Sequence, residues 1–303
     1  MATAVLNCEL MRELVHVVDK TMAKKNLEPS STLYQLALSG TMAYHSVLNY
    51  ASKSMFINTK DYDLSFDWYS NNTHIRPILS LFYLKYVGTV NFWRYDHNVR
   101  LTTERLANFM RDMPALHTLN IKNEVVRSRE LLTMLANDSR IRVLEILAYS
   151  FCAFRKDQLI KFANLDELHL NGNLSCVNIK QFEKETFPVL RKIIVKDTFL
   201  SKCGVHRLLS FIEQQAATVE TIHVFENKKP SRLPLAKHLS HIGDLVDALG
   251  TIAFKKRVEI VFEANRKKSE VESWVGNGFQ HCGDYYVQHH RFGQGHLWYY
   301  VKK

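Results

Sequence analysis

The stretch FANLDELHLNGN, residues 162–173, carries the clearest pattern in this chain. Leu165, Leu168 and Leu170 are spaced three and then two residues apart, and Asn173 follows three residues later. Such alternation is typical of a strand whose apolar side chains point into a core while the intervening side chains face outward. A small polar side chain after the strand can satisfy backbone groups of the next turn. The stretch therefore predicts a short strand that ends in a tight turn.

The same apolar spacing recurs along the chain. The further sets are Val87, Val90 and Phe92; Leu116, Leu119 and Ile121; Leu144, Leu147 and Tyr149; Leu190, Ile193 and Val195; and Val219, Ile222 and Val224. With Leu165 included, the first residues of successive sets are 29, 28, 21, 25 and 29 residues apart. Segments with helical spacing follow the sets, at 102–113, 128–137, 156–162, 178–187 and 202–215. The chain is thus predicted to repeat a strand-turn-helix unit.

This repetition resembles the leucine-rich repeat, whose units are about 20 to 29 residues long. The resemblance implies an α/β fold, a solenoid with a parallel sheet on its concave side and helices on its convex side. A βα barrel is the structural alternative, but it needs more strand-helix units than can be counted here.

Three regions follow from the change in pattern along the chain: 1–57, 58–227 and 228–303. The first is predicted to be helical because apolar residues recur at three- and four-residue steps, as at Leu6, Leu10, Leu14, Val17 and Val18. The second holds the repeats, with an alternating run over 62–68 that predicts a strand. The third is predicted to contain a helix at 235–253, a strand at 257–264 and a closing β-hairpin at 285–301.

Helices placed before leucine-rich repeats resemble a divergent F-box. Leu6, Glu9 and Leu10 match the start of the F-box pattern, and the pair Val18-Asp19 stands for its Leu-Asp. Asn7 replaces the usual proline, and residues 24–30 form an insertion. The resemblance implies docking to a Skp-type adaptor of a cullin-RING ubiquitin ligase through Leu6, Glu9, Leu10, Leu14, Leu36, Leu38 and Met42. The repeats would then hold a substrate protein, with no chemistry on this chain.

A second interpretation makes residues 6–50 only a cap that shields the end of the repeat core. The chain would then be a protein-binding scaffold without a ligase role. Both interpretations place the bound partner on the concave face, where the outward positions of the strands form two columns. The residues expected to contact a partner there are Trp93, Asn120, Lys122, His169, Asn171, Lys196, His223 and Phe225. Ala148 and Ser150 fall in the same columns.

Charge gives a third interpretation. The net charge is +10, and from Lys228 onward there are 13 Lys and Arg against 7 Asp and Glu. The basic groups at 255–257 and 266–268 are followed by the aromatic residues Tyr285, Tyr286, Phe292, Trp298 and Tyr299. Cations interleaved with aromatic rings suit single-stranded nucleic acid, which gives a basic nucleic-acid-binding accessory protein as the alternative function.

Several classes of function are not supported. The five cysteines are scattered, the start of the chain does not resemble a signal peptide, and no apolar stretch suggests a membrane span, so we expect a cytoplasmic or nuclear protein. Hydrolase and phosphate-loop motifs are missing, so we do not expect an enzyme. The tail residues His281, Cys282, His289, His290 and His296 match no standard zinc spacing. We therefore expect neither metal nor cofactor.

Overall fold

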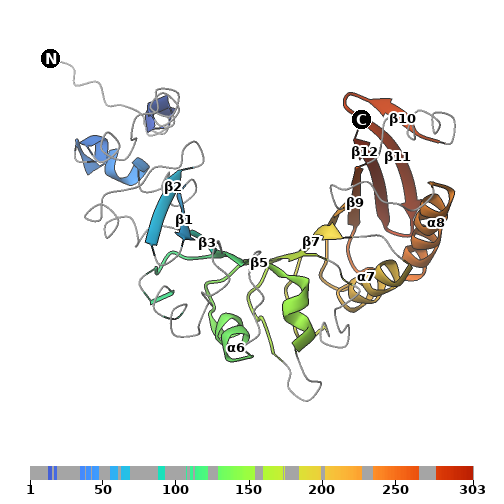
Figure 1. Cartoon of the computed structure of the whole chain (residues 1–303), viewed down its shortest axis with the longest axis horizontal. Coiled ribbons are helices and arrows are strands. Elements are labelled where there is room, and N and C mark those ends of the chain that lie inside the picture. The colour runs from blue at the N-terminus through green and yellow to red at the C-terminus, as the bar shows by residue number, and fades with distance from the viewer. Residues whose placement is uncertain are drawn as a thin grey trace. The chain divides into compact units, whose positions relative to one another are not determined.

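The computed structural model describes the chain in segments: 13–15, 17–18, 35–37, 39–41, 43–47, 55–60, 63–68, 88–92, 107, 110–111, 113–121, 129–153, 160–172, 174, 184–198, 202–226, 235–265 and 278–302. The chain divides into two compact units, Met1–Glu124 (unit 1) and Val125–Lys303 (unit 2). Both contain helices and strands, and most neighbouring strands are parallel (Figure 1). The prediction of an α/β fold is confirmed at this level.

The described residues of unit 1 include the strands β1 (Met55–Lys60), β2 (Asp63–Trp68), β3 (Thr89–Phe92) and β4 (Thr118–Ile121). β2 is antiparallel to β1, whereas β1, β3 and β4 run parallel. The strand predicted from the alternating run over 62–68 is therefore confirmed. Val90 lies opposite Leu119, as the predicted alignment of their two sets requires, and both side chains are fully buried.

The helical part of unit 1 departs from the predicted apolar stripe. Val15 is buried, but Leu14 is 39% exposed and Val17 is 56% exposed. Leu14 and Val17 are three residues apart on a helix, so they lie on the same side of it. Their side of the helix faces solvent instead of a core.

The strands of unit 2 form one sheet, most of it in chain order. β5 (Val143–Leu147), β6 (Glu167–Asn171), β7 (Lys192–Thr198), β8 (Thr221–Glu226) and β9 (Val258–Asn265) pair in parallel, each with the next. β12 (Gly295–Lys302) runs parallel to β9, and then β11 (Tyr285–Phe292) and β10 (Gln280–Cys282) follow antiparallel. The strand predicted at 257–264 and the C-terminal hairpin are confirmed.

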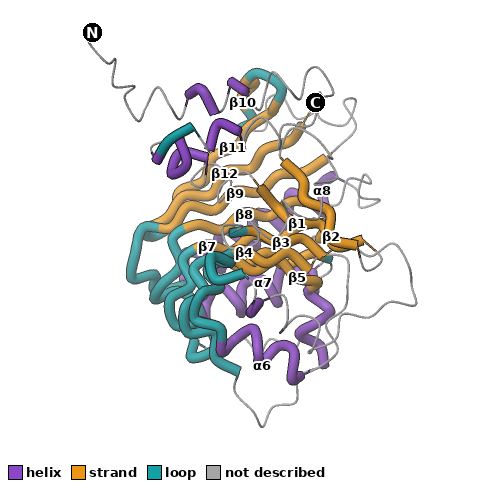
Figure 2. Tube along the Cα trace, turned by 90° about the vertical axis from the view of Figure 1, so that its left-hand side faces the viewer, coloured by secondary structure: helices purple, strands orange, loops and turns teal. Residues whose placement is uncertain are grey.

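Helices α6 (Arg129–Asn137), α7 (Lys202–Gln214) and α8 (Leu235–Thr251) lie on one face of this sheet (Figures 1 and 2). They confirm the helices predicted at 128–137, 202–215 and 235–253. The helices predicted at 156–162 and 178–187 are wrong where the structure describes them, because 160–162 are extended or irregular and 184–187 form a turn. Phe187 precedes Pro188, which disfavours the helical conformation at Phe187. Within the helix predicted at 102–113, the described residues 107 and 110–111 are helical, whereas residue 113 is not.

Two rows of apolar side chains cross the helix-covered face of the sheet. Residues at the same level pair directly across neighbouring strands, and all are at most 1% exposed. The rows are Leu144, Leu168, Ile193, Ile222 and Ile260, and Ile146, Leu170, Val195, Val224 and Phe262. Burial of such side chains is the main source of folding free energy, and here it also fixes which residues are neighbours.

The rows correct one predicted alignment. Leu144 pairs with Leu168 and not with Leu165, so the set in this strand is Ile141, Leu144 and Ile146. The sequence pattern is ambiguous there because Leu147 is also apolar. Ala148 and Ser150, predicted on the exposed columns, instead lie buried in the 3-10 helix η1 (Ala148–Ala153).

One backbone contact recurs where successive strands begin. The carbonyl of Arg142 accepts hydrogen bonds from the amides of Asp166 and Glu167, at 2.9 and 3.0 Å. The carbonyls of Asp166 and Arg191 accept the equivalent pairs of amides from the starts of β7 and β8. In unit 1 the carbonyl of Gly88 does the same for His117 and Thr118, both at 2.9 Å. β4, β6, β7 and β8 therefore enter the sheet by the same backbone geometry.

Candidate functional site

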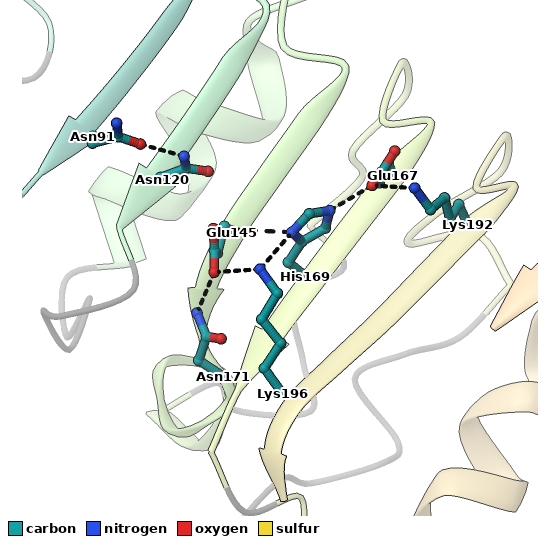
Figure 3. A network of polar contacts seen from close by, with 8 residues as sticks. All are labelled: Asn91, Asn120, Glu145, Glu167, His169, Asn171, Lys192 and Lys196. Carbon is teal, nitrogen blue, oxygen red and sulfur yellow. Dashed lines mark hydrogen bonds and ion pairs between the residues drawn. The ribbon is translucent and has the colours of Figure 1, made fainter. Parts of the chain in front are cut away.

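The second face of the unit 2 sheet has no helix among the described residues, and we call it the open face. Its side chains alternate along the strands with the buried rows. Five of the predicted partner-binding residues lie on this face: His169, Asn171, Lys196, His223 and Phe225. Asn120 belongs to unit 1, where its amide donates to the Asn91 side chain on the neighbouring strand (Figure 3). Trp93 and Lys122 lie outside the described residues.

A polar network crosses the open face from β5 to β7 (Figure 3). Glu145 Oε1 accepts hydrogen bonds from Asn171 Nδ2 at 3.0 Å and from Lys196 Nζ at 2.9 Å. Glu167 Oε1 contacts His169 Nε2 at 2.6 Å and Lys192 Nζ at 2.8 Å. These contacts join three strands through their side chains as well as through the sheet.

His169 connects the two halves of this network. Its Nδ1 lies 3.3 Å from Lys196 Nζ and 3.9 Å from Glu145 Oε2. A lysine ammonium can only donate, so the shorter contact makes Nδ1 an acceptor and leaves the proton on Nε2. That proton is donated to Glu167. The contacts therefore orient the ring with Nε2 toward Glu167 and Nδ1 toward Lys196, between two carboxylates and two lysines.

Both carboxyl groups are held in the charged form. Burial of Glu145 acts to raise its pKa, but the hydrogen bonds from Asn171 and Lys196 outweigh burial and leave this pKa below the usual value. The hydrogen bond from His169 has the largest effect on Glu167, and together with Lys192 it lowers the pKa of Glu167 to about 2 despite partial burial. At neutral pH the network is thus a fixed array of paired charges.

Asn171 departs from its predicted environment. It was expected on a solvent-facing column, but it is only 7% exposed because neighbouring side chains and the Glu145 carboxylate enclose it. Glu145 is likewise buried, and its side chain is 6% exposed. Asn171 therefore lies beneath the surface, whereas Lys192, Lys196, Glu167 and His169 keep partly exposed side chains that a partner can contact.

Beyond β7 the open face becomes aromatic. The rings of His223 and Phe225 stack with centroids 3.9 Å apart. Nε2 of His223 lies 3.7 Å from Glu263 Oε2, too far for a hydrogen bond. Burial, with the charge of Lys192, lowers the pKa of His223, so its ring is neutral at physiological pH. Phe225 is half-buried and presents part of its ring to a partner.

The C-terminal hairpin adds a second ring cluster. His289 stacks on Trp298 with centroids 4.1 Å apart, and its Nε2 lies 2.9 Å from Nδ1 of His296. Within the described part of the chain, no group of three or more His, Cys, Asp or Glu side chains is placed to hold a metal ion.

The hairpin also changes the nucleic-acid interpretation. Tyr286, Phe292 and Tyr299, predicted as possible base-stacking residues, are buried on the helix-covered side of the sheet. Trp298 and Tyr285 remain on the open face, where Tyr285 packs edge-on against Tyr300. Three of the five predicted aromatic residues are therefore core residues.

The adaptor-binding residues lie mostly outside the described residues. This holds for Leu6, Glu9, Leu10, Leu38 and Met42. Of the two described residues, Leu14 is exposed and Leu36 is half-buried, each within a helical segment.

Among the described residues no helix is long and apolar enough to cross a membrane.

Comparisons with known proteins identify no relative. The chain matches no protein-family model, no curated protein and no solved structure. Function is therefore inferred from the side chains and contacts described above. Sequence reasoning missed Glu145, Glu167 and Lys192, although charged residues at outward strand positions could have indicated them.

Proposed function

We propose that this chain is a non-enzymatic protein-binding module of the leucine-rich-repeat class, in which the open face holds a partner protein. The observation that carries this proposal is the succession of parallel strands β5 to β9 in chain order, which presents aligned outward side chains on one helix-free face. The recurring backbone contact at the starts of β4, β6, β7 and β8 supports a repeat solenoid.

The chemistry of the open face favours binding over catalysis. The charged groups of its polar network pair with one another, and its aromatic rings offer apolar contact area next to hydrogen-bonding groups. Partly buried aromatic rings surrounded by polar side chains are the usual composition of a protein-binding hot spot. His169 is bonded to Glu167 and Lys196, and the network holds no hydroxyl or thiol nucleophile for it to activate.

We further propose that the N-terminal helices dock onto a Skp-type adaptor, which would make the chain a substrate receptor of a ubiquitin ligase. The support is the F-box resemblance together with the solvent exposure of Leu14 and Val17 on one side of a helix. Apolar side chains exposed side by side gain about 25 cal/mol for each Å² that a partner covers.

Co-purification with a Skp-type adaptor tests the ligase part of this proposal. We expect the wild-type chain to form a stable complex and Leu14→Asp/Val17→Asp to lose it. The control is Val189→Asp, which places a charge on an exposed apolar residue of unit 2 and should leave the complex intact. A wild-type chain that fails to bind the adaptor would leave a scaffold without a ligase role.

A further inference from the structure

The open face contains one group of cations that is not internally paired. Arg291 lies directly opposite His296 in the β11–β12 hairpin, and Arg257 precedes β9, whose first residue pairs with Gly295. Both arginines are exposed. Their charges act on His296 and help to lower its pKa, after the effect of desolvation. Arg257, Arg291, His289 and His296 thus form one cluster, which we call the hairpin cluster.

Several other cations of unit 2 face carboxylates. Asp166 lies 3.9 Å from Arg142 and 3.4 Å from Arg191, and Glu220 is paired with Lys256. Lys192 and Lys196 are paired within the polar network. In contrast, neither Arg257 nor Arg291 has an ion-pair partner among the described residues. Glu259 on β9 lies directly opposite His296 and is one carboxylate beside two arginines. The hairpin cluster therefore carries an excess of positive charge.

The two histidines add directed hydrogen-bond donors. Their ring centroids are 5.1 Å apart with planes at 12°, and the joined nitrogens are 2.9 Å apart. This geometry fits two nearly coplanar rings joined by one hydrogen bond between His289 Nε2 and His296 Nδ1. Whichever ring donates, the pair keeps one N–H directed away from the shared bond. That N–H is available to an acceptor on a partner.

We propose that the hairpin cluster binds a carboxylate-rich segment of the protein held on the open face. Guanidinium groups bind carboxylates with two parallel hydrogen bonds, and the outward imidazole N–H supplies another donor. This inference rests on the protein-binding part of the proposed function and is independent of adaptor docking. It assigns an acidic region of the partner to the C-terminal end of the open face.

Single-stranded nucleic acid fits the cluster less well than an acidic peptide. A base needs a free aromatic face for stacking. One face of Trp298 is covered by His289 at 4.1 Å, and one face of Phe225 is covered by His223 at 3.9 Å. A carboxylate, in contrast, needs only the cations and the N–H donor.

Fluorescence anisotropy with the full chain tests this inference. The probe is a fluorescein-labelled peptide of alternating glutamate and glycine, titrated at low and at physiological salt. We expect Arg257→Glu/Arg291→Glu to weaken binding by about tenfold or more, because each reversal replaces an attraction by a repulsion. The matched control is Lys161→Glu/Lys184→Glu, which changes the net charge equally at two exposed lysines preceding β6 and β7, and it should bind nearly as wild type.

Each possible result of the binding experiment leads to a different conclusion. Equal losses in both variants would show non-specific attraction to a basic chain, and unchanged binding in the arginine variant would exclude the cluster; either result overturns the inference. Tighter binding of labelled oligouridine, lost in the arginine variant, would assign the cluster to nucleic acid. Adaptor capture by the arginine variant should stay intact, so failure of the ligase proposal and failure of this one remain distinguishable. A thermal melt of each variant checks that it is folded.

Discussion

Lys196 on β7 reaches across β6 and places its ammonium 2.9 Å from the Glu145 carboxylate on β5. Asn171, on the strand between them, donates to the same carboxylate oxygen at 3.0 Å. The carboxylate is buried, so these two donors are what compensate its lost hydration. A side chain on one strand thereby depends on partners from the two following strands, which makes the open face sensitive to single substitutions.

Lys196→Met should destabilise unit 2 by about 1–3 kcal/mol, because it leaves the buried Glu145 carboxylate with one fewer donor and no nearby cation. Urea unfolding followed by circular dichroism measures this change. The double variant Glu145→Gln/Lys196→Met removes both charges and should recover part of the loss. If the double variant is less stable than Lys196→Met, the two residues do not act as a pair.

Stability should fall in two stages as the pH is lowered. His223, His290 and His296 have pKa values below the ordinary 6.5 in the folded chain, mainly through desolvation, so the unfolded chain binds protons more readily. These histidines therefore leave the free energy of unfolding undiminished above pH 6.5, and it decreases as the pH falls below that value. Glu167 causes the second loss of stability at lower pH, because its pKa is about 2 in the folded chain and 4.5 in the unfolded chain. Protonation of this partly exposed group should cost about 1–2 kcal/mol after allowance for solvent screening.

Urea unfolding at a series of pH values from neutral to acid measures both stages. Glu167→Gln should reduce the second stage, to which Glu145 and Asp138 also contribute, and leave the first in place. Stability that rises as the pH falls from neutral would contradict the assigned direction of the histidine pKa values.

The parallel strands could be predicted because their leucines have to meet across the sheet. The spacing of Leu165, Leu168 and Leu170 matches that of Leu190, Ile193 and Val195. Leu168 pairs with Ile193 and Leu170 with Val195 in the structure. Leu144 was misaligned because Leu147 fits the same short pattern, and only the neighbouring strand decides between the two. A local pattern thus predicts a strand better than it predicts alignment.

The candidate site was less predictable, since alternation indicates which side chains point outward but not what they contact there. Asn171 points outward and is nevertheless buried by Glu145, a residue from another strand. Phe292 and Trp298 are both aromatic tail residues, yet one is core and the other is on the open face. Strand pairing across the hairpin decides which face of the sheet each ring occupies, and no nearby sequence pattern indicates that face.

Gly295→Ala should destabilise the C-terminal hairpin. A Cβ atom at this position would overlap the Phe292 ring and approach the backbone carbonyl of Val258, so β12 and β9 would have to move apart. We expect a loss of about 1–3 kcal/mol in urea unfolding. Gly243→Ala is the control, because Gly243 lies within α8 with no atom near its added Cβ. Alanine there should stabilise by about 0.5–1 kcal/mol. Equal effects of the two substitutions would exclude the proposed overlap.

His290 offers a test of the buried side of the hairpin. Its Nε2 is buried and has no hydrogen-bond partner among the described residues, and burial with the charge of His289 lowers its pKa. An unpaired buried nitrogen costs about 1–3 kcal/mol, so His290→Leu should leave stability unchanged or raise it by up to about that amount at neutral pH. The variant should also lose less stability below pH 6.5, because one depressed imidazole is removed. The exposed His281→Leu serves as the control, and it should change neither quantity. If His290→Leu is strongly destabilising, then Nε2 is satisfied in solution and the imidazole is a structural donor.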